Sequence, residues 1–298
     1  MPAWLTQEVL YAYSVPMFVI VILVEMFYSH RSELKLYRTG DVLKNLYFAI
    51  INIGLDLVMK VFSFIMLGWA YQYRIITIEN VWLYWIALVL LQDFAYYVHH
   101  FVDHHCRFFW AVHRTHHSSE LFNITTGFRS PVLQPLYRYF YFMPVALLGF
   151  EPLHIMFAYA ATQIYGTLIH TQTIRRMGVF EYFMVTPSHH RVHHGSNVAY
   201  LDRNMGMFLI VWDKLFGTFQ KEKDAEPVRF GIVTPLTEEQ ARHPMTTITH
   251  EFEAIWQDAT QANLTPMQRL KYIFAAPGWS HDGSKMTSKQ MQDRAQAG

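Results

Sequence analysis

The residues best suited to chemistry in this chain are histidines with helical spacing. Of its 17 histidines, 13 lie between His99 and His194. Residues three or four positions apart share one face of an α-helix, so one His-x-x-x-His and two His-x-x-His-His patterns each predict a helix face of grouped imidazoles. These patterns comprise His100, His104, His113, His116, His117, His190, His193 and His194.

Eight imidazoles exceed what one metal ion can bind, so the patterns favour a site with two metal ions. Neutral imidazole binds zinc, copper, iron and nickel, which leaves the metal open on ligand type alone. The His-Glu-x-x-His motif of zinc proteases does not occur in the sequence. Glu151 and His154 have the spacing of the Glu-x-x-His motif of carboxylate-bridged di-iron proteins, but they lie at an expected turn and we interpret them as structural.

The composition indicates what kind of scaffold must hold these histidines. Of 298 residues, 52% are apolar and 16% are charged, whereas soluble domains have roughly 45–50% and about 25%. This shift favours contact with a lipid bilayer. A net charge of +1 argues against a nucleic-acid-binding protein. The single cysteine, Cys106, excludes a disulfide within the chain and a metal site built from several cysteines.

Four apolar stretches approach or reach the roughly 20 residues that a membrane-spanning helix needs. They cover residues 11–28, 46–71, 81–98 and 132–169. The last is too long for one crossing and is interrupted near Gly149 and Pro152, so we expect a hairpin of two crossings or one re-entrant pair. Within the second stretch, Asp56 and Lys60 share a helix face, and we expect them to pair.

Basic residues predict the orientation of these stretches. The loop after the first stretch contains Arg31, Lys35, Arg38 and Lys44, whereas no Lys or Arg precedes that stretch. We therefore expect this loop in the cytoplasm, which brings all three histidine patterns to the cytoplasmic face. The sequence thus predicts an all-α integral membrane protein with about four transmembrane helices and a cytoplasmic helical cap that carries the histidines. In a bacterium this membrane would be the inner one.

We expect a single membrane-embedded domain over residues 1–298. Residues 1–98 should form membrane helices, 99–131 carry the first two histidine patterns, 132–170 form the membrane hairpin, 171–219 carry the third pattern, and 220–298 form a polar cytoplasmic region. We expect the last twenty or so residues to be loosely ordered.

At the histidine patterns the sequence resembles the fatty acid hydroxylase (sterol desaturase) superfamily, membrane enzymes defined by these three histidine boxes. The resemblance covers about residues 93–219 and includes the surroundings of each box. These are Asp93-Phe-Ala-Tyr-Tyr97, Trp110-Ala-Val, Thr186-Pro187, His194-Gly-Ser-Asn197, Leu201-Asp-Arg-Asn204 and Trp212-Asp-Lys-Leu-Phe-Gly-Thr218. The stretch from His117 to Thr126 is most similar to the branch that contains alkylglycerol monooxygenase, which cleaves ether lipids with tetrahydrobiopterin. The family usually has Arg after the first histidine of the first box, where this chain has Phe101.

The resemblance implies a non-haem di-iron centre with only histidine ligands. It assigns the ligands to the eight box histidines and to His170 as a ninth, whereas His99 and His189 are extra. The side chains that we expect to hydrogen-bond the ligand imidazoles are Asp93, Glu120, Asn123, Asn197 and Asp202. The resemblance further implies O₂ as co-substrate, a lipid substrate, and an external electron donor such as a tetrahydropterin.

The implied reaction is O₂-dependent hydroxylation or desaturation of a lipid C–H bond, with an alkylglycerol ether lipid as one substrate. A sterol, a carotenoid or a fatty-acyl lipid on the same scaffold is the alternative. A membrane metal transporter or metal-storage protein is the alternative from another class. A transporter should carry histidines or acids along its spans, and here the histidines gather beyond the ends of the apolar stretches.

Overall fold

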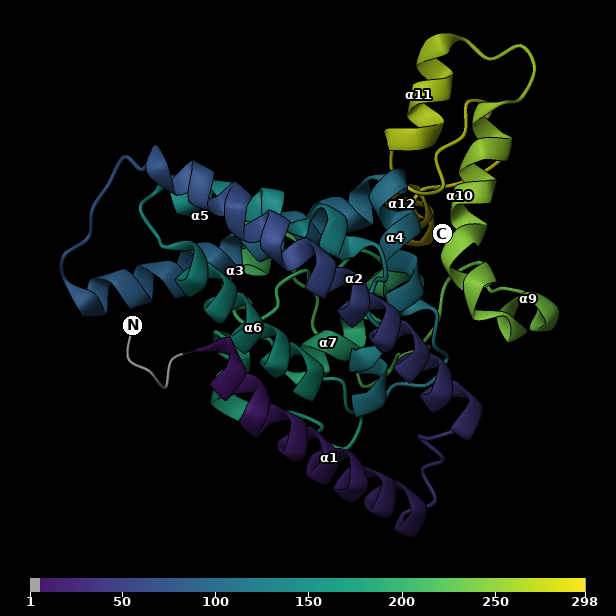
Figure 1. The fold of residues 1–298 in the computed structure, drawn as a ribbon. Helices are drawn as coiled ribbons and strands as arrows, with labels where there is room; N and C mark the ends of the chain where they lie inside the picture. The colour runs from purple at the N-terminus through teal and green to yellow at the C-terminus, as the bar shows by residue number, and fades with distance from the viewer. Residues whose placement is uncertain (1–5, 298) are drawn as a thin grey trace.

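The computed structural model describes residues 6–297, and within that range the chain is helical, as expected, with no strand (Figure 1). The α-helices are α1 (Gln7–Arg31), α2 (Thr39–Gln72), α3 (Val81–His105), α4 (Arg107–His117), α5 (Met143–Leu147), α6 (Pro152–Leu168), α7 (Pro187–His193), α8 (Val211–Phe216), α9 (Glu238–Arg242), α10 (Pro244–Ala259), α11 (Pro266–Phe274) and α12 (Ser288–Ala297). The short 3₁₀ helices are η1 (Ile124–Phe128), η2 (Gln134–Leu136), η3 (Arg138–Phe142), η4 (Gly178–Tyr182) and η5 (Val198–Tyr200).

Three of the described helices, α1, α2 and α3, are long and apolar enough to cross a membrane, which confirms the first three expected stretches. Their side chains face outward over much of their length, because only 17%, 11% and 33% of their apolar windows are buried. Apolar surface on this scale fits lipid better than water. With 34 residues, α2 is about 50 Å long, so it must tilt or extend beyond a bilayer core of about 30 Å.

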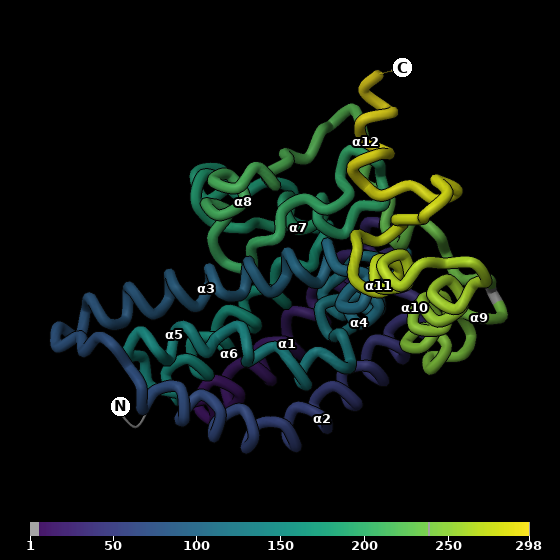
Figure 2. Tube along the Cα trace, turned by 90° about the horizontal axis from the view of Figure 1, so that it is seen from above, coloured from purple at the N-terminus to yellow at the C-terminus, as the bar shows by residue number. Residues whose placement is uncertain are grey.

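The fourth apolar stretch differs from the expectation. It contains η2, η3, α5 and α6, and the five residues of α5 cannot cross a bilayer. The stretch therefore does not form two helices of bilayer length, and its longest helix is α6. The expected break is present at Gly149, which has a φ of +96° and whose Cβ, if it had one, would lie 2.1 Å from the Ile76 carbonyl oxygen. Helix α6 contacts α1, α2 and α3 and lies in the middle of the bundle (Figure 2).

The expected pair of Asp56 and Lys60 is wrong, because Asp56 forms an ion pair with Arg138 of η3 instead. The Arg138 guanidinium also lies over the rings of Tyr139 and Tyr159, at 5.1 and 5.0 Å from their centroids. The sequence spacing was correct for a helical pair, but a buried arginine from another element offers Asp56 a partner within the protein. This contact fastens the fourth stretch to α2.

The C-terminal helices α9–α12 lie at the end of the molecule opposite the N-terminus and the α2–α3 turn (Figures 1 and 2). Helices α10 and α11 pack on α4, and Arg107 at the start of α4 pairs with Glu251 at 2.9 Å and Asp258 at 2.7 Å. Helix α12 packs on η5, where Gln292 donates to the Leu201 carbonyl at 2.9 Å. The end of the described chain is therefore helical and docked, and the expectation of loose order is wrong there.

Candidate metal centre

The end of α3, α4 and α7 each carry one histidine pattern, and the fold brings the three together. Helices α3 and α4 are consecutive and pack against each other, with Cys106 between them. Helix α7 begins after Thr186, with Pro187 in its first turn, where a missing N–H costs no helical hydrogen bond. The Thr186 N–H donates to Nδ1 of His189 at 3.3 Å. His189 therefore caps the start of this helix and lies outside the grouped imidazoles.

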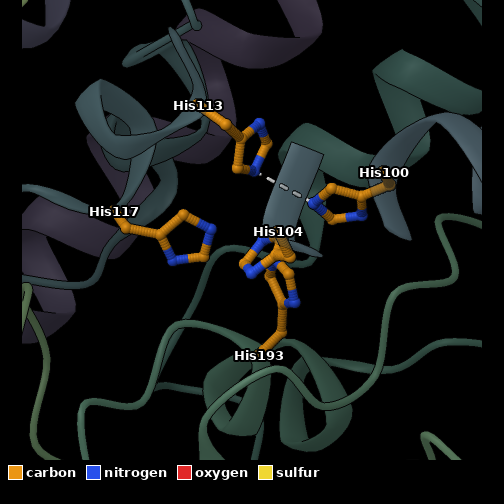
Figure 3. Close-up of side chains that lie close together, drawn as sticks. All are labelled: His100, His104, His113, His117 and His193. Atoms are coloured by element: carbon orange, nitrogen blue, oxygen red, sulfur yellow. Dashed lines mark hydrogen bonds between the residues drawn. The ribbon is translucent and has the colours of Figure 1, made fainter. Parts of the chain in front are cut away.

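The nine histidines predicted as ligands are buried and lie in two groups. His100, His104, His113, His117 and His193 form the five-histidine group (Figure 3). His116, His170, His190 and His194 form the four-histidine group. Within each group, one ring nitrogen of every residue lies within 4.8 Å of those of the others. The groups adjoin, because the rings of His117 and His194 stack with centroids 4.4 Å apart.

Many of these rings are oriented through Nδ1 by an acceptor outside the two groups. The acceptors are the carbonyls of Met205 for His100 (2.7 Å), Arg129 for His116 (3.0 Å), Gly166 for His170 (2.7 Å) and Arg203 for His193 (3.0 Å), and the Asp202 carboxylate for His104 (3.2 Å). A neutral imidazole has one N–H. Donation from Nδ1 therefore leaves Nε2 with a free lone pair, which is the form that binds a metal.

The free Nε2 atoms converge inside each group. In the five-histidine group, Nε2 of His100 lies 3.0 Å from Nε2 of His113, and Figure 3 shows these two rings turned toward each other. In the four-histidine group, Nε2 of His170 lies 2.9 Å from that of His190 and 3.2 Å from that of His194. Each Nε2 presents a lone pair when its Nδ1 carries the proton, and in that tautomer a cation among the rings is needed to offset the repulsion between the lone pairs.

Unpartnered nitrogens give a test of whether a metal fits this donor set. The Nε2 atoms of His104, His117 and His193 are buried and have no hydrogen-bond partner. A buried polar atom left unpaired costs about 1–3 kcal/mol, and three in one group are unusual in a folded protein. Metal ions bound by these nitrogens would remove that cost, so the residues present fit a metal site.

Burial keeps these rings in the neutral form that a metal requires. Desolvation lowers the pKa of His116 to about 4. Desolvation, strengthened by the neighbouring imidazoles, also holds the pKa of the other histidines outside α3 well below the ordinary value. These are His113, His117, His170, His190, His193 and His194. Neutral imidazoles at ordinary pH are therefore available as ligands without first losing a proton.

Asp103 is an acid of the site that the sequence reasoning missed. Its Oδ2 lies 3.4 Å from Nδ1 of His113 and 3.3 Å from Nε2 of His99. The carboxylate also accepts from Gln134 Nε2 at 2.9 Å and from the Tyr137 hydroxyl at 2.8 Å. Asp103 thus lies beside His113 and beside His99, which is outside both groups, but neither imidazole forms a hydrogen bond with it. The available signal was the i, i+4 spacing of His99 and Asp103 beside the first box.

Of the five side chains expected to hydrogen-bond the ligand imidazoles, Asp202 does so, through His104. Burial raises the pKa of Asp202, but the hydrogen bond and charge interaction with His104, together with the hydrogen bond from Ser288, outweigh burial, so the pKa lies below the ordinary value. The carboxylate is therefore charged at neutral pH.

The expectation is wrong for the other four side chains, which support the backbone or face solvent. Asp93 accepts from the N–H groups of Phe208 and Leu209 and from Trp212 Nε1, at 2.9–3.1 Å, which ties α3 to the segment before α8. Asn123 accepts from the Thr125 N–H at 3.0 Å and caps η1, Asn197 accepts from the Arg229 N–H at 2.8 Å, and Glu120 is exposed. Only the Asn123 bond is of the local kind that Asn and Asp often form with backbone a few residues away.

Phe101, which replaces the arginine common in the resembled family, stacks on His105 with ring centroids 3.8 Å apart. The Nδ1 of His105 also bonds the Phe101 carbonyl at 2.9 Å. An aromatic contact within the helix thus occupies the place of an ion pair. The spacing of His100 and His104, on the opposite side of this turn, is unaffected.

A cavity of about 310 Å³ opens onto the five-histidine group. His104, His117 and His193, which carry the unpartnered nitrogens, line its inner wall. Its outer wall comes from α10 and from the segment that leads into α12, including Glu251 and Met286. A small molecule can therefore reach the histidines from the side covered by the C-terminal helices.

Residues 85–218 match the family model described as fatty acid hydroxylase. The chain is 37% identical over 200 residues to an alkylglycerol monooxygenase of Homo sapiens, covering 65% of this chain and 42% of the relative. It is 35% identical over 213 residues to an alkylglycerol monooxygenase of Xenopus tropicalis, covering 70% and 45%. It is 31% identical over 147 residues to an ornithine lipid hydroxylase of Rhizobium tropici, covering 48% and 44%.

The chain thus spans less than half the length of these relatives. No solved structure matches it. The matched residues 85–218 include most of α3 and all of α4 and α7, and all nine grouped histidines lie within this range. Through this domain, which carries the three histidine boxes and the two groups they form, the chain belongs to the fatty acid hydroxylase family.

Proposed function

We propose that this chain is a membrane-bound, non-haem di-iron oxygenase that uses O₂ to hydroxylate or desaturate a C–H bond of a lipid. The observation that carries the proposal is the convergence of nine buried imidazoles in two adjoining groups at the end of a membrane helix. The two groups would each hold one iron, and the pair would supply the activation of O₂. Family membership favours iron over the other metals that imidazole binds.

The chain's own part is to hold the ligands and to limit water. Asp202 and the backbone carbonyls fix ring orientations, which preorganises the donor set. Apolar rings pack against both groups. The ring centroids of Trp110 and His104 are 5.2 Å apart, and those of Phe122 and His170 are 5.4 Å apart. Such packing covers one side of each group, while the cavity leaves the five-histidine group accessible on another side.

The placement of the site supports a lipid substrate. Helix α3 runs from its exposed apolar start directly to His100 and His104, so the centre lies at one end of a membrane segment. We propose that this end is cytoplasmic, because the α1–α2 loop contains Arg31, Lys35 and Arg38. The helices α1–α3 with the re-entrant α5–α6 segment would form the membrane part, with α4 and α7–α12 as the cap. Because the histidines gather at this end and not along the spans, transport is disfavoured.

The substrate class that we propose is a glycerol ether lipid, supported by the names of the alkylglycerol monooxygenase relatives. Hydroxylation inserts one atom of O₂ into a C–H bond, and the other becomes water with two electrons and two protons from an external donor. On the carbon beside the ether oxygen, the product is a hemiacetal, which separates into a fatty aldehyde and glycerol. We propose a tetrahydropterin as the donor.

The test is product analysis with the full chain in membranes. A 1-O-alkylglycerol, a sterol and a fatty-acyl lipid are each supplied with O₂ and a tetrahydropterin, and fatty aldehyde and hydroxylated lipid are measured. We expect O₂-dependent aldehyde from the ether lipid, its loss in His116→Ala, and its retention in His30→Ala, because His30 is exposed and outside both groups. Hydroxylated sterol or acyl lipid alone would overturn the substrate class. Equal turnover in His116→Ala would overturn the proposed centre.

A further inference from the structure

An apolar patch outside the three long helices is built from two segments that lie side by side. It comprises Val179, Phe180, Tyr182 and Phe183 of the η4 region and Leu215 and Phe216 of α8, with exposed fractions from 43% to 74%. The Ile210 N–H donates to the Phe183 carbonyl at 3.1 Å, which joins the segments. We call this surface the η4–α8 patch. Soluble surfaces rarely gather so many large apolar side chains.

The patch cannot turn inward, because the residues beside it already fill the interior. Val185 and Ile210 are fully buried and form a small core with Ile169. The Val185 N–H donates to the Phe208 carbonyl at 2.8 Å, and Met184 bridges Leu209. These contacts fix the backbone, so the aromatic side chains face outward as a permanent feature.

The patch continues the outward apolar face of α3. Leu83, Ile86 and Leu90 are exposed on α3 at spacings of three and four residues, and Phe94 is next along that face. The Phe94 ring contacts Trp212 and Phe216 of α8, with centroids 5.0 and 5.9 Å apart. Figure 2 shows α8 alongside α3. The surface of a candidate membrane helix therefore passes without interruption into the η4–α8 patch.

The rim of the patch is basic. Lys214 of α8 donates to the Tyr182 carbonyl at 2.8 Å, and its ammonium lies over the Tyr182 and Phe219 rings. Arg175 and Arg176 are exposed just before η4 and share Asp224 as a partner. Aromatic side chains with flanking Lys and Arg are typical of the zone between the hydrocarbon core and the lipid headgroups.

We propose that the η4–α8 patch inserts into the headgroup zone of the bilayer that α3 crosses, as a membrane contact in addition to the spanning helices. The inference depends on α3 lying in the membrane. It has a consequence for the site, since Phe183 of the patch lies seven residues before His190, and the exposed Leu90 lies ten residues before His100. Ten helical residues rise about 15 Å, so the lipid-facing part of α3 ends within about that distance of His100. A lipid would then reach the histidines with little withdrawal from the bilayer.

The test measures lipid exposure of single spin labels on the full chain. In a Cys106→Ser background, which removes the single cysteine, cysteine is placed at Val179, Leu215, Ile86 or Lys289. Lys289 on α12 is the matched control, because its side chain is 78% exposed among polar neighbours. The labelled proteins are placed in nanodiscs of phosphatidylcholine and phosphatidylglycerol, and collision with O₂ is compared with collision with a water-soluble nickel chelate.

We expect the ratio of O₂ to nickel collisions at 179 and 215 to exceed that at 289 several-fold, and brominated lipids to quench a fluorophore at the same two positions. Ratios at 179 and 215 equal to that at 289 would overturn the proposal. Labels shielded from both reagents, without quenching by brominated lipid, would indicate a protein partner and overturn it as well. If the label at Ile86 also gave a ratio as low as that at 289, α3 itself would lie outside the bilayer. The label at Ile86 therefore distinguishes failure of the membrane assignment of α3 from failure of the patch proposal.

Discussion

The contact between Asp202 and His104 offers a substitution that changes charge but not shape. The Asp202 carboxylate accepts from Nδ1 of His104 at 3.2 Å, and the two side chains are 23% and 3% exposed. Asp202 has a φ of +52°, in the left-handed region that Asn tolerates far better than most residues. Asp202→Asn therefore preserves the backbone and the side-chain volume while it removes the negative charge opposite His104.

The magnitude follows from what the carboxylate does for its ligand. Loss of the partner of a metal-binding imidazole typically weakens metal affinity about 10–100-fold, or roughly 1.4–2.8 kcal/mol. Because the Asn carbonyl can still accept from Nδ1, we expect the lower end of that range. His104 belongs to the five-histidine group. We therefore expect the affinity of that group for iron to fall and the affinity of the four-histidine group to stay unchanged.

The assay is iron release to a competing chelator from the iron-loaded full chain. We expect one of two release steps to shift by about 10-fold in Asp202→Asn. Asp224→Asn serves as the matched control, since Asp224 pairs with Arg175 and Arg176 at the surface and should release iron like the unmodified chain. Equal shifts of both steps, or no shift of either, would refute the assignment of Asp202 to one group.

Further predictions concern other supports of the two groups. Glu25 of α1 accepts from the Ile124 N–H at 2.9 Å and from the Thr171 hydroxyl, next to His170. Glu25→Ala should therefore lower the affinity of the four-histidine group for iron in the same release assay. A shift of the release step of the five-histidine group would contradict this. A Cβ on Gly166 would lie 2.0 Å from Met207 Sδ, whereas nothing lies within 4 Å of one on Gly54. Gly166→Ala should therefore lower the Tm, at a cost of about 1–3 kcal/mol, and Gly54→Ala should leave it unchanged or raise it; the reverse order would refute the packing argument. Burial lowers the pKa of His116 in the folded protein to about 4, whereas the pKa in the unfolded chain is about 6.5. Below about pH 6.5 the unfolded chain therefore binds more protons than the folded protein, and the free energy of unfolding falls as the pH falls. The Tm of metal-free protein should thus be lower at about pH 5.5 than at about pH 8, and a higher Tm in acid would show that these rings are protonated in the folded state.

The grouped histidines could be predicted because their chemistry is local. Spacings of three and four residues place imidazoles on one helix face whatever the tertiary structure, and the structure brings all nine predicted residues together. Their division into groups of five and four could not be predicted. His116 and His117 are adjacent in sequence but lie in different groups, because successive residues on a helix point about 100° apart.

The partners of the histidines were harder to predict, for a physical reason. Four are backbone carbonyls, and every residue has a carbonyl, so side-chain chemistry gives no signal. Asp93 and Asn123 had suitable side chains, but they accept from backbone N–H groups, of Phe208 far along the chain and of Thr125 close by. Asp103 was overlooked because only the fold shows that it faces His113.

The membrane part was predictable as far as it depends on length and hydropathy. The three long helices met both criteria. The fourth stretch was equally apolar, yet it folds as 3₁₀ turns, the short α5 and α6. Buried contacts such as the ion pair of Arg138 with Asp56 decide that arrangement, and hydropathy does not report them.

The measurement that tests the central claim most directly is the metal content of the full chain grown with labelled iron, with Mössbauer spectroscopy, beside His116→Ala. Two histidine groups predict about two irons per chain, antiferromagnetically coupled in the unmodified protein, with the coupling lost in the variant. Zinc alone, resisting replacement by iron and supporting no O₂ consumption with a reductant, would contradict the di-iron oxygenase and favour a hydrolytic or structural site.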